Sequence, residues 1–300
     1  MTVLPQPDNL SIPVSVLILT RNEEANIEQC LRNVRFSEDI VVLDSFSTDR
    51  TLELVKTFPG VRVVQRVFDT EYRQRNYGLH DIQYKHDWVY ICDADERVPG
   101  DMVAEMRDVA NRKSNPCAAY RIRYKNMFLG RWIKHSSGYP VWIIRLVRPG
   151  SVSYEVRETN VHPIVQGRIG ELKTHFVHYS FNSGLRRWFD KHDFYSSREA
   201  AEGAKVRAQR MTSWSTLTNA DPMVRRRALK NLSYFLIGRG VWRFLHSYFL
   251  RGGWLDGTAG FHYCMMISMY EYWIELKIRE IERPWRATTL DLATRLLVEQ

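Results

Sequence analysis

Short runs of β-branched and leucine residues alternate with helix-length segments over the first hundred residues of this chain. The runs are VSVLILT (14–20), DIVVLD (39–44), VRVVQRVF (61–68) and WVYIC (88–92). Such nearly continuous apolar runs are typical of strands that are buried on both faces, and the segments between them carry helix-capping residues. The pattern therefore predicts an α/β fold with a mostly parallel, Rossmann-like sheet flanked by helices.

Polar residues end or directly follow three of these runs, where the carboxyl ends of the strands are expected. They are Thr20, Arg21, Asn22 and Glu23 after the first run, Asp44 after the second, and Asp93 and Asp95 after the fourth. Ligands of open α/β sheets bind at such ends. An isolated Asp-x-Asp is most often a turn, but at the mouth of a parallel strand its oxygens suit Mg²⁺ or Mn²⁺ shared with phosphates.

The length of 300 residues and a hydrophobic content of 44% predict one large domain with an accessory region. We divide the chain into a tail (1–12), a main domain (13–210) and a C-terminal helical region (211–300). Within the main domain, short strand-like and aromatic pieces continue the sheet between residues 117 and 180, and a polar helix is expected over 183–210.

The C-terminal region differs in composition from the main domain. Residues 221–253 hold seven Lys or Arg against one Asp, interleaved with Trp242, Phe244, Tyr248 and Phe249. This pattern predicts an amphipathic helix that associates with a membrane surface. The uncharged stretch 257–270 is shorter than the roughly 20 residues that a spanning helix needs. A helical pair packed on the main domain is the alternative, and nucleic-acid binding is disfavoured by the high apolar content.

The net charge of +9 suits a phosphate-bearing ligand or an anionic membrane surface. Four scattered cysteines, which lack metal-type pairs, are predicted to be buried free thiols in a reducing cytoplasm: Cys30, Cys92, Cys117 and Cys264. The first residues show no secretory signal, so we expect the protein to stay inside the cell.

Four motifs resemble the nucleotide-sugar half of family 2 glycosyltransferases, which have the glycosyltransferase A fold. In chain order they are SVLILTRNEEANIEQCL, DIVVLDSFSTDRTLEL, QRNYGL and YICDADERV. Four further stretches are similar to a bacterial branch that includes lipopolysaccharide-core β-glucosyltransferases: LGRWIKHSSGYPVWIIRLVR, HFVHYSF, RRWFDKHDFYSSREA and GWLDGTAGF. The resemblance implies an inverting, metal-dependent glycosyltransferase that binds the donor with residues 13–100 and the acceptor with residues 101–210.

The resemblance also implies which residues bind the donor. The residues expected to contact base and ribose are Thr20, Arg21, Asn22 and Glu23, with helix capping as the alternative. Asp44 matches the acid that binds uracil, which favours UDP, although Ser45 stands where many relatives have a second acid. Arg73 and Arg75 would neutralise the diphosphate, with a solvated helix position as the alternative for Arg73.

In the Asp93-Ala94-Asp95 motif, Asp95 is implied to be the principal ligand of Mg²⁺ or Mn²⁺. Asp93 would bind ribose or metal-bound water. His178 is similar to a late histidine that completes the metal shell in relatives, with a structural role as the alternative. His175 is a weaker candidate.

An inverting enzyme needs a carboxylate that takes the proton of the acceptor hydroxyl. Counting back from Gly167, the position of that acid in relatives falls on Val161. We choose Glu158 as the base, Glu155 second and Glu96 third, with an exposed loop as the alternative for the first two.

The expected donor is a nucleotide-diphosphate sugar, UDP-linked, and the expected acceptor is a glycolipid or lipid-linked saccharide of bacterial envelope polysaccharide synthesis. We expect the protein on the cytoplasmic face of the inner membrane, without nucleic acid as a partner. The absence of an acid at Val161 keeps a polyprenyl-phosphate glycosyltransferase open, because a phosphate acceptor needs no strong base. A non-catalytic membrane-bound scaffold of the same fold is the remaining alternative.

Overall fold

The structure of the protein is a computed structural model that describes residues 11–156, 161–209, 217–219 and 222–283. The chain forms two compact units. The first consists of the residues up to Trp188 together with Arg251–Phe261, and the second of Phe189–Leu250 and the residues from His262 onward.

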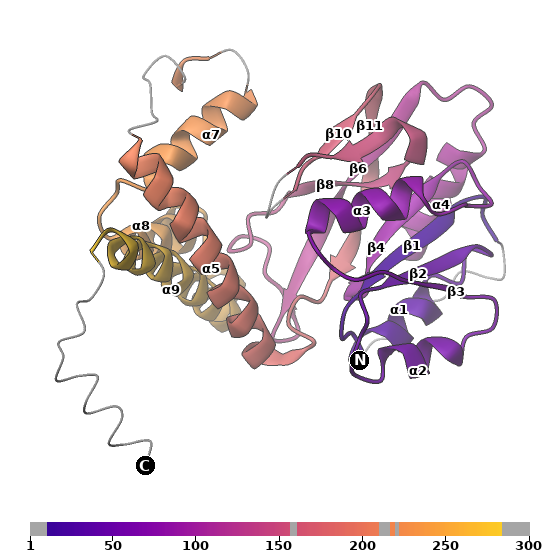
Figure 1. Cartoon of the computed structure of the whole chain (residues 1–300), viewed down its shortest axis with the longest axis horizontal. Coiled ribbons are helices and arrows are strands. Elements are labelled where there is room, and N and C mark those ends of the chain that lie inside the picture. The colour runs from indigo at the N-terminus through magenta and orange to yellow at the C-terminus, as the bar shows by residue number, and fades with distance from the viewer. Residues whose placement is uncertain (1–10, 157–160, 210–216, 220–221, 284–300) are drawn as a thin grey trace. The chain divides into compact units, whose positions relative to one another are not determined.

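A nine-stranded sheet forms the centre of the first unit (Figure 1). Its parallel half is β3-β2-β1-β4, and these strands span Arg62–Gln65, Ile40–Asp44, Ser15–Thr20 and Val89–Asp93. The order continues through β8 (Trp142–Val147), β6 (Cys117–Phe128), β11 (Arg168–His178) and β5 (Glu96–Arg97), while β7 (Arg131–Trp132) pairs with β6. Of these added strands only β6 and β11 run parallel to each other. The prediction of a mostly parallel sheet flanked by helices is confirmed.

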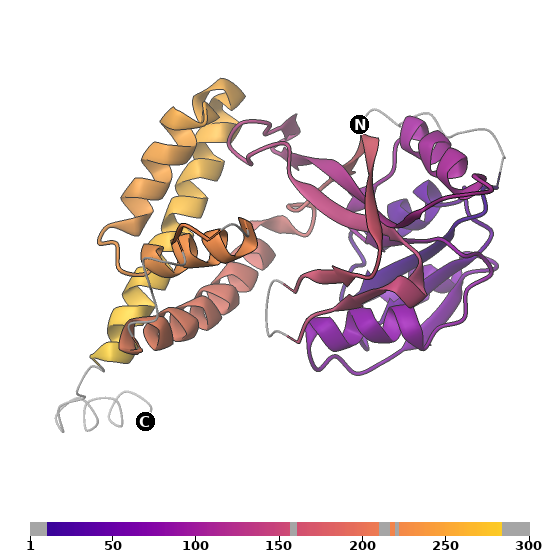
Figure 2. The same ribbon diagram turned by 90° about the horizontal axis from the view of Figure 1, so that it is seen from above.

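Helices and a hairpin cover both faces of this sheet (Figures 1 and 2). The helices are α1 (Ile27–Asn33), α2 (Thr51–Lys56), α3 (Glu71–His80) and α4 (Gly100–Ala110), and the hairpin is β9 (Val152–Tyr154) with β10 (Pro163–Val165). Successive strand residues point to opposite faces, so Val16 and Ile18 pack with α1 and α4, whereas Leu17 packs with α3 and β9. Burial on both faces is why the central strands consist of continuous apolar runs.

The strand β3 departs from the expectation of burial on both faces. It is the outermost strand of the parallel half and, among the strands that the structure describes, pairs only with β2. Three of its four residues are exposed, including Val63 at 41%. An apolar run thus formed a strand as predicted, but its position at the sheet edge left it in contact with solvent.

The second unit is helical. It contains most of α5 (Gly184–Ala208), then α7 (Pro222–Ser233), α8 (Arg239–Phe244), a π-helical turn (Leu245–Leu250) and most of α9 (Gly257–Glu282). Its core holds Ala200, Val206, Tyr234, Ile274 and Ile278. The predicted C-terminal helices are therefore present. Within the described residues, no helix combines the length and apolar character that crossing a membrane requires.

The four cysteines all lie in the described part of the chain, and all are buried without a disulfide. Cys30 and Cys92 approach each other, with their sulfur atoms 3.8 Å apart. The prediction of buried thiols is confirmed.

Candidate functional site

Asp93 ends strand β4 between two arginines that come from other elements. Arg145 of β8 places a guanidinium nitrogen 2.5 Å from Asp93 Oδ2, and Arg75 of α3 places one 3.8 Å from Asp93 Oδ1. Burial opposes ionisation of Asp93, but Arg145 and Arg75 outweigh it and hold the pKa of this carboxyl well below its usual range. Asp93 is therefore an ionised carboxylate held in place by two cations.

Arg145 also binds Glu96, the first residue of β5. The Arg145 side chain is 4% exposed and that of Glu96 1%, and the two groups form an ion pair. Burial raises the pKa of Glu96 to about 7, even though Arg145 favours its charged form. A buried charge is tolerated only when it is paired, so Arg145 binds two acids that would otherwise destabilise the turn 93–96.

Asp95 faces His178, the last residue of β11, across this turn. Asp95 Oδ2 lies 3.3 Å from His178 Nε2, and each side chain is about a quarter exposed. Burial lowers the pKa of His178, but the Asp95 carboxylate outweighs burial and raises it overall. The other ring nitrogen, Nδ1, lies 3.1 Å from Ser180 Oγ, which donates its proton to Asn126 Oδ1 at 2.8 Å. This chain of contacts orients the imidazole with Nε2 toward Asp95.

Asp95 and His178 together fit a divalent ion such as Mg²⁺ or Mn²⁺. Two neighbouring ligands at about 2.1 Å from an octahedral ion lie about 3 Å apart, and both side chains are accessible from solvent. In the residues that the structure describes, no group of three or more His, Cys, Asp or Glu could hold a metal. The pair would leave most positions to water and phosphate, as Mg²⁺ sites commonly do. Both oxygens of Asp93 face arginines, and its role as a ligand stays a prediction.

The loops that follow β1 and β2 are tied together by hydrogen bonds. Asn22 adopts a positive φ of 57°, and its side chain accepts the Thr48 N–H at 2.7 Å. The Glu23 N–H donates to Thr51 Oγ1 at 2.8 Å. The structure thus brings the predicted residues of these two loops to one edge of the sheet.

Asp44 is completely buried beneath those loops. Its carboxylate accepts hydrogen bonds from Thr20 Oγ1 at 2.9 Å and from both the N–H and the hydroxyl of Ser47, at 2.9 and 2.5 Å. These contacts give Asp44 a clear structural role in shaping the edge. Its contact with a uracil ring stays a prediction.

The predicted arginines have different surroundings. Arg21 is exposed and lies over the ring of Phe68, 5.5 Å from its centre. Arg73 is 58% exposed and pairs with Asp69 at 3.2 Å. This arrangement agrees with the alternative of a solvated helix position. Arg75 is 14% exposed and approaches Asp93. Arg75 is thus linked directly to the Asp-x-Asp motif.

Of the predicted bases, Glu158 lies outside the described residues. Glu155 directly follows β9, whose Tyr154 is anchored to α3 by two hydrogen bonds with the Asn76 amide, at 2.7 and 3.1 Å. The Tyr154 ring also lies under the guanidinium of Arg75, 5.4 Å away, which links Glu155 to the surroundings of Asp93.

The remaining base positions are less suitable. Val161, where relatives carry the acid, packs against the apolar cluster beneath α3. Glu96 is buried and paired with Arg145, so an acceptor hydroxyl cannot reach it. Glu96 is better explained as a residue that positions Arg145.

Two arginines at this edge were missed by the sequence analysis. Arg145 had a usable signal, because it is a lone charge inside the apolar stretch VWIIRLV, and a charge in a buried strand requires a partner. Arg187, near the start of α5, binds Glu23 Oε1 at 2.7 Å and the Arg21 carbonyl at 2.9 Å. It lies 164 residues from Glu23, and no local pattern indicated this contact.

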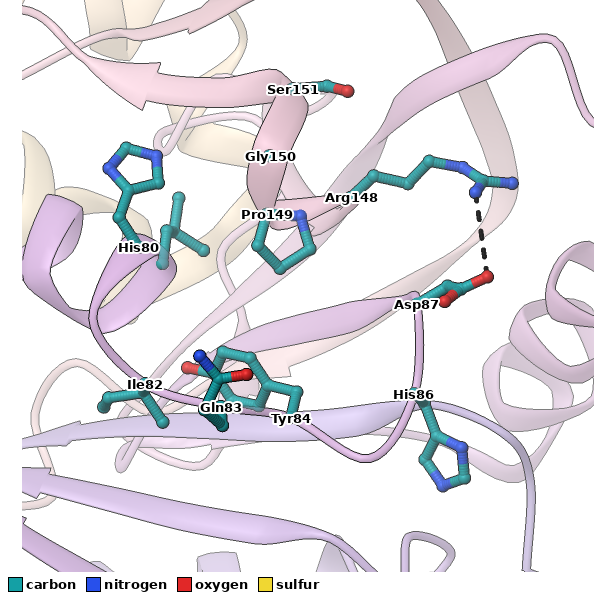
Figure 3. A pocket seen from close by; sticks show the side chains of 11 residues that line it. His80, Ile82, Gln83, Tyr84, His86, Asp87, Arg148, Pro149, Gly150 and Ser151 are labelled. Atoms are coloured by element: carbon teal, nitrogen blue, oxygen red, sulfur yellow. Dashed lines mark ion pairs between the residues drawn. The ribbon is translucent and has the colours of Figure 1, made fainter.

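A separate pocket of about 550 Å³ lies elsewhere in the first unit (Figure 3). It is lined by the segment that precedes β4 and by the residues that follow β8, where Arg148 pairs with Asp87 at 4.0 Å. The pocket therefore adjoins the amino end of β4, whereas Asp93 and Asp95 lie at its carboxyl end. It is not the candidate site.

Comparison with known proteins identifies the family of the chain. The model of the family "Glycosyl transferase family 2" matches residues 15–193, which is more than half of the chain. The fold is that of a glycosyltransferase. The chain belongs to glycosyltransferase family 2, and the resemblance proposed from its motifs is confirmed.

Among curated relatives, the lipopolysaccharide core biosynthesis glycosyltransferase LpsC of Rhizobium meliloti is 23% identical over 272 residues, covering 89% of this chain and 92% of the relative. An uncharacterized glycosyltransferase of Rickettsia typhi is 24% identical over 279 residues, with coverages of 89% and 87%. Among solved structures, S. aureus TarS 1-349 in complex with UDP has a TM-score of 0.43 at 14% identity, with coverages of 92% and 93%.

We predict that Arg145→Met lowers the free energy of unfolding by about 3 to 5 kcal/mol, because it leaves the buried Glu96 without its counter-charge and Asp93 with Arg75 alone. The double variant Arg145→Met/Glu96→Gln should recover part of this loss. Arg148→Met is the matched control, since its side chain is 36% exposed and its ion pair is long. Urea unfolding measures all three, and equal losses for Arg145→Met and Arg148→Met would contradict the assigned role.

Proposed function

We propose that this glycosyltransferase moves a sugar from a nucleotide-diphosphate donor, UDP-linked, to a glycolipid or lipid-linked saccharide in bacterial envelope polysaccharide synthesis. We propose further that the transfer inverts the anomeric centre and depends on Mg²⁺ or Mn²⁺. The observation that carries the proposal is the Asp95–His178 pair, 3.3 Å apart, beside the Asp93–Arg145 ion pair. The name of the R. meliloti relative, which refers to lipopolysaccharide core biosynthesis, supports the choice of pathway class.

Each group of residues in the site has its own proposed role. Asp95 and His178 would hold the ion, which supplies a positive charge that stabilises the departing diphosphate. Asn126 and Ser180 fix the orientation of His178. Arg75 adds a cation close to Asp93, and the hydrogen-bonded loops after β1 and β2 would enclose the nucleotide.

In the inverting step, the acceptor oxygen attacks the anomeric carbon while the bond from that carbon to the diphosphate oxygen breaks. The acceptor proton passes to a carboxylate, and the nucleotide diphosphate leaves with the bonding electron pair. We propose Glu158 as that carboxylate and Glu155 as the second choice. The apolar packing of Val161 favours one alternative, transfer to a polyprenyl-phosphate oxygen, which needs no strong base.

Asp95→Asn tests the donor site. The amide is a poorer ligand for a hard cation than the carboxylate, so we expect at least a tenfold loss of Mn²⁺-dependent UDP affinity and of UDP release from a UDP-sugar. Calorimetry and a coupled UDP assay measure the two effects. Asp87→Asn, at the other end of β4, is the matched control and should retain both. Unchanged values in Asp95→Asn would exclude Asp95 as a ligand, and a wild type that binds no UDP would overturn the proposed donor.

Glu158→Gln tests the base. It should lower the rate of sugar transfer to glycolipid extracted from bacterial membranes by about a hundredfold or more, because general base catalysis contributes that much. UDP binding should not change. Glu155→Gln is the comparison and should retain most activity. If Glu155→Gln loses transfer and Glu158→Gln retains it, Glu155 is the base. If both variants retain transfer, a phosphate acceptor is favoured.

We also propose that the enzyme works as a peripheral protein on the cytoplasmic face of the bacterial inner membrane. Residues 222–255 carry seven Lys or Arg and no Asp or Glu. In the second unit, large apolar side chains on and beside α8 are exposed, including Ile237 at 79%, Trp242 at 62%, Phe249 at 57% and Leu250 at 80%. Positive charge together with exposed aromatic residues suits an anionic lipid surface.

Trp242→Ser/Phe249→Ser tests this proposal in the full chain. The double variant should cosediment far less with vesicles that contain phosphatidylglycerol, because it removes apolar area that would enter the interface. Phe194→Ser, which is 53% exposed on α5, is the control and should bind as the wild type does. The proposal would be contradicted if the double variant bound the vesicles as well as the wild type does. It would also be contradicted if the wild type bound neutral phosphatidylcholine vesicles as well as those that contain phosphatidylglycerol.

A further inference from the structure

Strand β6 of the first unit carries basic side chains at three alternate positions, Arg121, Arg123 and Lys125. Alternate residues of a strand share one face of the sheet. The same face begins with Ala119, which packs against the cluster beneath α3, so the basic row extends beyond the part of the face that α3 and β9 cover. The three cations therefore form a row on the sheet itself.

Two tryptophans hold these cations in fixed positions. The guanidinium carbons of Arg121 and Arg123 lie 5.0 and 5.2 Å from the centre of the Trp142 ring, which comes from the neighbouring strand β8. The ammonium of Lys125 lies 4.7 Å from the centre of the Trp132 ring. Contacts between cations and aromatic rings restrict the side chains, so little conformational freedom remains to be lost when an anion binds.

The positive charge of this row is only partly balanced. Arg121 pairs with Glu171, but both side chains are about half exposed, and such a pair is weak. Among the described residues, no carboxylate forms an ion pair with Arg123 or Lys125. The Arg123 Nε–H is buried and has no hydrogen-bond partner there, although Nη2 donates to the Lys173 carbonyl. A buried donor without an acceptor is uncommon and favours a ligand that supplies one.

The surroundings of His175 support an excess of positive charge. This residue lies opposite Arg123 in the register of β11 with β6. Burial lowers the pKa of His175 and the charge of Lys125 lowers it further, whereas Asp101 raises it and Arg123 adds a smaller lowering effect.

The basic row leads to the candidate site along both strands. Arg123 lies three residues before Asn126 on β6, about 10 Å along the strand, and Asn126 orients His178 through Ser180 from the opposite face of the sheet. Arg145 follows Trp142 by three residues on β8, a distance of about 10 Å along a strand. A short oligosaccharide that reaches the site could therefore also contact the arginines.

We propose that Arg121 and Arg123, held against Trp142, bind a phosphate or carboxylate group of the acceptor, so that the enzyme selects acidic saccharides. This inference rests on the proposed glycosyl transfer and adds the chemical class of its acceptor. Arginine forks suit both anions because each offers paired N–H donors to two oxygens.

Binding of defined saccharides to the full chain tests the inference. The probes are pentamannose phosphate, which carries phosphate, tetragalacturonate, which carries carboxylates, and neutral maltotetraose, each titrated by calorimetry with UDP and Mn²⁺ present. We expect at least one acidic probe to bind at least tenfold more tightly than maltotetraose. In Arg121→Gln/Arg123→Gln this affinity should fall about tenfold or more, since two charge-assisted contacts are lost.

The matched control is Arg32→Gln/Arg107→Gln, which removes the same charge from exposed ion-paired arginines on α1 and α4. It should stay within about twofold of the wild type, which separates a specific site from the general attraction of a basic protein. Equal losses in the two double variants would overturn the inference. So would equal affinity for maltotetraose, or no binding of either acidic probe.

UDP affinity, measured in the same samples, separates this inference from the proposed function. It should be unchanged in Arg121→Gln/Arg123→Gln. If the wild type binds no UDP, the proposed donor is wrong. If the wild type binds UDP but does not select the acidic probes, only the proposed acceptor class is wrong.

Discussion

The buried guanidinium of Arg145 is the interaction on which the candidate site depends. It lies on β8, the strand that joins the parallel half of the sheet to the rest, and it binds an acid on each side of the turn after β4. Without Arg145, Glu96 could not remain buried and charged, and Asp93 would keep only Arg75 at 3.8 Å, so Arg145 fixes the turn that presents Asp95. The three ionic groups position the motif, and Asp95, which is about a quarter exposed and faces His178, is the carboxylate proposed to meet the ligand.

The short strand β5 completes this arrangement from the other side. It pairs with the end of β11, with Glu96 opposite His178, and the Tyr179 N–H donates to the Asp95 carbonyl at 2.8 Å. These backbone contacts set the distance between Asp95 and His178 before any ligand binds. The site thus joins a parallel βα half, which carries the nucleotide-binding loops, to a mixed half that carries His178 and the basic row of β6.

Much of this organisation was predictable, because it follows from local patterns. The runs at 14–20, 39–44 and 88–92 became buried parallel strands, and the polar residues after them meet at one edge, as parallel strands require. For residues 61–68 the predicted strand was confirmed, but its predicted burial on both faces was wrong. Hydrophobicity alone does not reveal which strand lies at the edge of a sheet. The two candidate arginines of α3 looked alike in sequence, yet the helix turns only Arg75 toward Asp93 and leaves Arg73 with Asp69.

Periodicity and motifs within a few residues are local properties, so the chain alone allowed prediction of the fold class, the family and the strand ends expected to bind ligands. Which distant side chains meet became clear only in the folded protein. Arg145 lies 52 residues from Asp93, and Arg187 lies 164 residues from Glu23. Contacts at such separations follow from strand order and register, which no local pattern specifies. For that reason Asp95 could be chosen from its motif, whereas its partner and its supporting arginine required the folded chain.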